Sequence, residues 1–124
     1  MPVSARTRDA QSNHPNAPLF PLMRRLEAEY QRLLTKSKAC APPFGTIPVG
    51  GGDWMDYHFK SEAVFGLLAA LRFGKPLEAA IQDGIEDCKY AIALWNGRRE
   101  YQVRRWEQMG DGYLRALVFS LKGG

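Results

Sequence analysis

Apolar residues recur at helical spacing in four stretches of this chain. In the first stretch they are three or four positions apart: Leu19, Met23, Leu26, Tyr30 and Leu33. This spacing places the side chains on one face of an α-helix, and the basic residues of the stretch fall on the other face. The pattern therefore predicts an amphipathic helix over residues 20 to 37.

Two further helices are predicted in the middle of the chain. The second starts after Asp53 and ends at Phe73, because Gly74 is a natural C-terminal cap. Its apolar positions cover most of the helix circumference, which is typical of the most buried helix of a bundle. The third has Pro76 in its first turn and ends at Trp95, where an Asn-Gly pair follows.

The last stretch, about 99 to 121, keeps one apolar phase from Val103 to Leu121. Gly110-Asp111-Gly112 interrupts it, because glycine weakens a helix interior by about 1 kcal/mol relative to alanine. Either the helix kinks there or Asp111 caps a separate final helix. The fold class that follows is all-α, a compact bundle of four helices, or five if the last stretch divides.

Two segments lack a helical pattern. Residues 1–18 are rich in Pro, Ser and Asn and are predicted to form an extended or disordered arm, which leaves 19–124 as a single helical domain. Residues 38–53 contain three prolines and four glycines, a composition that predicts one long loop. The sequence leaves open whether this loop is a contact surface or only a connecting segment.

Composition places the chain among globular proteins. Its 124 residues are 45% hydrophobic and 24% charged, which suits one domain that folds without a cofactor. No apolar run reaches the length of about 18 residues that a membrane span needs, and no secretory signal is visible, so we expect a cytoplasmic protein with no membrane partner. Cys40 and Cys88 are too isolated to indicate a disulfide framework or a metal site.

The glycine triplet at 50–52 resembles a phosphate-binding loop only superficially. It lacks the lysine and hydroxyl that such loops carry, and Asp53 and Asp56 would place negative charge beside the phosphate. Asp53 is instead predicted to cap the second helix, with the triplet acting as a hinge.

Candidate catalytic and metal-binding residues are few. His58 and Glu62 are four apart on one helix face, but no further ligand matches them, so we expect a histidine at the solvent edge paired with a carboxylate. No serine lies in a nucleophile elbow. We therefore expect no catalytic residues, no metal and no cofactor, although a carboxylate pair such as Asp83 with Asp87 leaves an enzyme open.

The arginines are the strongest functional signal. Residues 22–52 and 98–124 each carry a net charge of +3 and flank an acidic middle, within a total of +4. On a helical wheel, the basic residues of the last stretch cluster opposite its apolar face around an exposed tyrosine. The predicted binding residues are Arg98, Tyr101, Arg104, Arg105 and Arg115 on this face, and Arg24, Arg25 and Arg32 on the first helix. Part of this charge is expected to pair locally, Glu100 with Arg104 and Arg25 with Glu29.

Two functions fit these basic faces. The first is a non-catalytic helical subunit of a nucleoprotein assembly, whose arginines bind the nucleic acid backbone in a salt-sensitive manner. The second is a protein-interaction module, which acts as an inhibitor, adaptor or self-assembling scaffold and binds an acidic protein surface. The acidic third helix would also suit head-to-tail contact between copies in a homo-oligomer.

Overall fold

The computed structural model describes residues 13–41 and 52–121 of the chain, and these residues form helices and no strand. The elements are η1 (Ala17–Leu19), α2 (Phe20–Ala39), α3 (Gly52–Arg72), α4 (Leu77–Trp95) and α5 (Glu100–Leu121). The predicted all-α bundle is confirmed. The predicted boundaries of the helices are right to within about two residues, which is the usual spread of helix ends.

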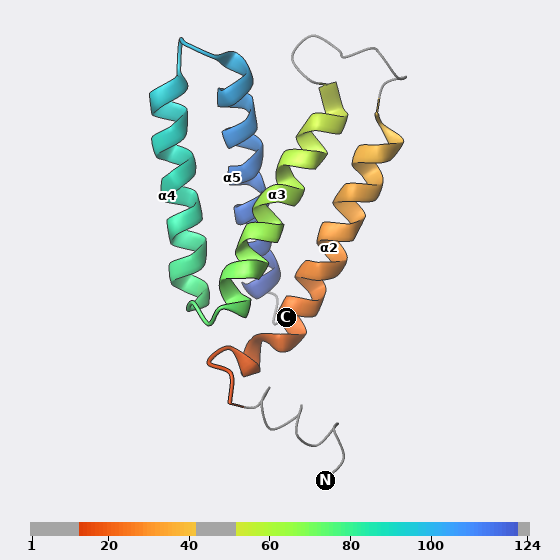
Figure 1. Ribbon diagram of the computed structural model, residues 1–124, viewed down its shortest axis with the longest axis vertical. Helices are drawn as coiled ribbons and strands as arrows, with labels where there is room; N and C mark the ends of the chain where they lie inside the picture. The colour runs from red at the N-terminus through yellow and green to blue at the C-terminus, as the bar shows by residue number, and fades with distance from the viewer. Residues whose placement is uncertain (1–12, 42–51, 122–124) are drawn as a thin grey trace.

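The four helices run alternately up and down, so that α3 and α5 point in the same direction (Figure 1). Helix α3 packs against α2 on one side and α5 on the other, while α4 packs mainly against α5. Helices α2 and α4 therefore lie at opposite edges of the molecule, with α3 and α5 between them.

A close crossing of α3 and α5 explains Gly112 in the last helix. A Cβ atom on Gly112 would lie 3.0 Å from the Cβ of Ala63 and 3.0 Å from the carbonyl oxygen of Lys60. Glycine therefore allows the two helices to approach. The sequence left open whether a separate final helix begins at Asp111. The structure excludes this, because α5 is one continuous helix from Glu100 to Leu121.

One core connects all four helices. Its most deeply buried side chains come from α2 and α3: Leu26, Leu33, Val64, Leu67, Leu68 and Leu71. Cys88 is buried in a second cluster with Phe59 and Met109. Phe73, the last residue of the predicted second helix, is 93% exposed, because α3 ends at Arg72 and Phe73 lies in the following turn.

Residues 13–18, predicted as part of an extended arm, contact the turn between α3 and α4. Asn16 is buried, and its side-chain amide donates hydrogen bonds to the carbonyl oxygens of Leu71, at 2.9 Å, and Lys75, at 2.8 Å. The backbone N–H of Asn16 donates to Nδ1 of His14, whose Nε2 lies 2.7 Å from the carbonyl oxygen of Arg72. These side chains bind carbonyl groups of the last turn of α3 and of the turn that follows it. Residues 1–12 of the predicted arm lie outside the described residues.

We expect Asn16→Ala to lower the free energy of unfolding by about 1 kcal/mol, because the buried hydrogen bonds to the carbonyl oxygens of Leu71 and Lys75 are lost. Urea denaturation followed by circular dichroism measures this loss. Asn13→Ala, at an exposed position in the same segment, is the control and should leave the stability unchanged. Equal stability of the two variants would contradict an anchoring role for Asn16.

The predicted loop at 38–53 overlaps the end of α2 and the start of α3, and its residues 42–51 lie outside the described residues. Helix α3 begins at Gly52, so Asp53 lies inside the first turn and is not the N-cap that the sequence predicts. Its charge still favours this end of the helix. Among the residues that the structure describes, no helix is both long enough and apolar enough to cross a membrane.

Candidate functional site

The structure places the predicted arginines of α5 in contact with carboxylates of other helices. Arg104 donates two hydrogen bonds of 2.7 Å to the carboxylate of Asp56 on α3, one from Nε and one from Nη2. Such a paired geometry is the strongest form of an arginine–carboxylate contact. These hydrogen bonds raise the pKa of Arg104 further above its ordinary value.

Arg105 is held in a second contact with α3. Its guanidinium lies 3.1 Å from Glu62, and Nε2 of His58 lies 3.1 Å from the other oxygen of the same carboxylate. The predicted pairing of His58 with Glu62 is therefore present. Within residues 13–41 and 52–121, no cluster of three or more histidine, cysteine, aspartate or glutamate side chains could hold a metal ion.

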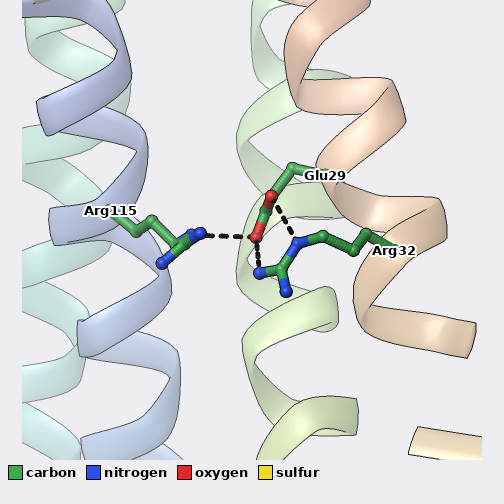
Figure 2. A network of polar contacts seen from close by, with 3 residues as sticks. All are labelled: Glu29, Arg32 and Arg115. Carbon is green, nitrogen blue, oxygen red and sulfur yellow. Dashed lines mark hydrogen bonds and ion pairs between the residues drawn. The ribbon is translucent and has the colours of Figure 1, made fainter. Parts of the chain in front are cut away.

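The third contact is a buried carboxylate shared by two arginines. Figure 2 shows Glu29 of α2 pointing toward α5, between Arg32 and Arg115. Nε of Arg32 donates to Glu29 Oε2 at 2.9 Å, Nη2 of Arg32 donates to Oε1, and Nε of Arg115 donates to Oε1 at 2.9 Å. Glu29 is 6% exposed, whereas the side chains of Arg32 and Arg115 are 38% and 50% exposed.

Glu29 is ionised in this environment despite its burial. Burial alone raises the pKa of its carboxyl, but hydrogen bonds from both arginines and their positive charges lower it more. The pKa therefore lies below its ordinary value of 4.5. Glu29 consequently carries a negative charge at neutral pH, and its contacts with Arg32 and Arg115 join α2 to α5.

Other predicted residues remain exposed and have no ion pair among the described residues. Arg24, Arg25 and Arg98 belong to this group. Tyr101 is 46% exposed and packs with its ring edge-on to Phe59, at 5.7 Å between ring centroids. Tyr101 is thus exposed as the sequence predicts, whereas Arg104, Arg105 and Arg115 of the same predicted face are held by carboxylates of other helices.

Sequence reasoning predicted local partners for these charges, and the structure contradicts both pairs. Arg104 binds Asp56 and not Glu100, while Glu29 binds Arg32 and Arg115 and not Arg25. A signal for Glu29 was present in the sequence. It lies three residues after Leu26 and four before Leu33, so it shares the apolar face of its helix.

A groove that the sequence analysis did not anticipate lies between α4 and α5. It has a volume of about 590 Å³, and Ile85 and Ile92 of α4 line it together with Trp106 and Leu114 of α5. Cys88 and Gly110 also line it. Burial raises the pKa of Cys88 to about 11, so its thiol is protonated and unreactive at neutral pH.

Apolar side chains continue along α5 from this groove. Leu114, Val118 and Leu121 are 51%, 46% and 77% exposed, and their spacing of four and three places them on one helix face. Leu121 was expected to point inward with the rest of its stripe. It shares its helical phase with the buried Val103 but is exposed as the last residue of α5.

Two of the three charged residues that line the groove are acidic. Glu107 and Asp111 contribute carboxylates from α5, and Lys89 contributes one ammonium group from α4. The surface therefore combines an apolar centre with a net negative border.

Comparison of the chain with protein-family models, curated proteins and solved structures gives no match.

Proposed function

We propose that this chain is a non-catalytic protein-interaction module that binds an amphipathic helix of a partner protein in the groove between α4 and α5. The observation that supports this function is the row of exposed apolar side chains, Leu114, Val118 and Leu121, beside an apolar groove. Contiguous exposed apolar surface is typical of binding sites, and a groove between two helices is suited to a third helix.

The border of the groove defines the chemistry of the partner. Glu107 and Asp111 outnumber the single cation Lys89, so a partner helix with lysine or arginine beside its apolar ridge would be complementary. Its apolar residues would recur at three and four positions to contact Ile85, Ile92 and Leu114 in turn. The partner is thus a basic amphipathic helix, and not the acidic protein surface that the sequence suggests.

The nucleic-acid hypothesis receives less support from the geometry. Arg104, Arg105, Arg115 and Arg32 each donate to a carboxylate of this chain, so binding a phosphate would require breaking or sharing these contacts. A salt-dependent affinity needs cations that release counterions on binding, and the intramolecular pairs reduce their number.

A synthetic helical peptide of leucine and lysine, about four turns long, is a suitable probe. We expect it to bind with chemical-shift changes at the methyl groups of Ile85, Ile92 and Leu114 in NMR spectra. Leu114→Glu should weaken binding by about tenfold or more, because it introduces a charge into the apolar centre. Phe73→Glu is the matched control, since Phe73 is 93% exposed and lies outside the groove.

Two controls decide between the alternatives. A peptide of the same composition with a scrambled order should not bind, and equal binding of both peptides would contradict recognition of a helical ridge. Fluorescence anisotropy with labelled single-stranded DNA, duplex DNA and RNA tests the other hypothesis. Saturable binding at about 150 mM salt that is lost in Arg24→Ala/Arg25→Ala would favour the nucleic-acid function instead.

A further inference from the structure

Opposite charges lie on the two outermost helices of the molecule. Helix α2 carries four exposed cations that have no ion-pair partner among the described residues: Arg24, Arg25, Lys36 and Lys38. Arg24 and Lys38 lie on its outward side, and Arg25 and Lys36 lie on the edge next to its neighbouring helices. Arg25 lies over the ring of Phe119, at 5.3 Å, and Lys36 over that of Tyr57, at 5.6 Å, which leaves their charges available at the surface.

Helix α4 carries the complementary charge. Glu78, Glu86 and Asp87 are exposed and have no ion pair within the described ranges, while Asp83 pairs with Lys75 in the preceding turn. Gln82 donates a hydrogen bond of 2.7 Å to Glu86, which leaves the charge of that carboxylate uncompensated.

The α4 surface also carries exposed apolar side chains. Tyr90 of α4 is 72% exposed and follows Glu86 by four positions, so it stands on the same outward face as that carboxylate. Leu94 is 43% exposed one turn further along. The outward face of α2 carries the exposed residues Ala28, Gln31 and Thr35 between its two groups of cations.

These surfaces cannot meet within one molecule, because α2 and α4 lie at opposite edges (Figure 1). We infer that the outer face of α2 in one copy binds the outer face of α4 in a second copy. The contact joins two different surfaces, so each copy retains one free face of each kind, and repeated contacts build a ring or a filament. Exposed ion pairs are weakened by salt, so the association is strongest at low ionic strength.

This inference does not depend on the proposed function. Ile85 and Ile92 face the groove beside α5, whereas Glu86 and Tyr90 lie on the outward side of the same helix. A peptide in the groove and a second copy on the outer face therefore use separate residues. Failure of the peptide experiment leaves the copy-to-copy contact unaffected, and the reverse holds as well.

The test is sedimentation velocity of the full chain at low salt, from micromolar to millimolar protein concentration. We expect the mean mass to rise with concentration to about twofold or more that of the monomer, as a head-to-tail contact requires. Arg24→Glu/Arg25→Glu should remain monomeric, because the two new carboxylates offset Lys36 and Lys38 and α2 no longer attracts the acidic α4. Glu86→Lys/Asp87→Lys should remain monomeric because both are then basic.

A mixture of these two variants is the decisive sample. Neither variant has an α2 face that attracts its own α4 face, but α4 of the first variant remains complementary to α2 of the second, so we expect association only in the mixture. Arg98→Glu/Arg99→Glu is the matched control, with the same charge change at exposed positions outside both faces, and should associate like the wild type. Wild-type protein that stays monomeric throughout, or variants that associate as well as the wild type, would overturn the inference. Circular dichroism confirms that each variant is folded.

Discussion

Gly84→Ala is expected to lower the free energy of unfolding by about 2 to 3 kcal/mol, because a Cβ atom there would lie 2.4 Å from two ring carbons of Tyr113. Helix propensity alone predicts the opposite sign, since alanine in a helix interior is favoured over glycine by about 1 kcal/mol. A measured loss of stability therefore reports the packing of α4 against α5. Urea denaturation followed by circular dichroism provides the measurement.

Gly66→Ala is a matched control for this prediction. It is the same substitution in the interior of α3, and its Cβ would lie 3.7 Å from the hydroxyl of the same Tyr113, an ordinary contact. We expect Gly66→Ala to be neutral or slightly stabilising. In a double variant with Tyr113→Leu, the loss caused by Gly84→Ala should shrink, because the smaller side chain removes the clash. If the two alanine variants are equally stable, the Tyr113 ring moves aside freely and the prediction is wrong.

The second large effect is expected for Glu29→Gln, which should lower the free energy of unfolding by about 2 kcal/mol at neutral pH, since hydrogen bonds to charged groups contribute about 1.5 to 3 kcal/mol. The figure is smaller than for a fully buried ion pair, because Arg32 and Arg115 are exposed enough to regain water. Glu27→Gln is the control. It removes an exposed pair with Arg72 and should change stability by less than about 1 kcal/mol.

The contribution of Glu29 should depend on pH in a defined direction. Its pKa in the folded protein is lower than the ordinary value of 4.5, so the unfolded chain binds the proton more readily. The stability difference between the wild type and Glu29→Gln is therefore fully present above pH 4.5 and is lost as the pH falls through the lower folded pKa. A difference that grows on acidification would contradict the assigned ion pair.

Apolar spacing was sufficient to predict the four helices and their approximate ends, because each helix keeps an apolar face over several turns. The same spacing could not reveal how the helices pair with one another. The glycines of α5 suggested a local break, but Gly112 instead faces Ala63 across a helix crossing. Helix propensity describes a segment in isolation. Gly112 is instead required by the close contact of α5 with Ala63 of α3.

Charged residues were the least predictable part of the candidate site. Spacing along a helix identifies only partners on that helix, so Arg104 was assigned to Glu100 and its actual partner Asp56 was missed. The groove was missed for a related reason. Ile92 and Leu114 each belong to an amphipathic helix, and only the packing of α4 on α5 decides which apolar residues remain outside the core.

The arrangement of the helices also has a consequence for how the fold opens. Helices α3 and α5 are covered from several sides, whereas α2 and α4 at the edges are supported mainly by one neighbour each. Elements with fewer buried contacts open at a lower free energy than the global unfolding reaction. Backbone amides of α2 and α4 should therefore exchange with solvent through partial openings that keep the inner pair intact. The surfaces proposed for binding thus lie on, or next to, the elements that need the least energy to rearrange around a partner.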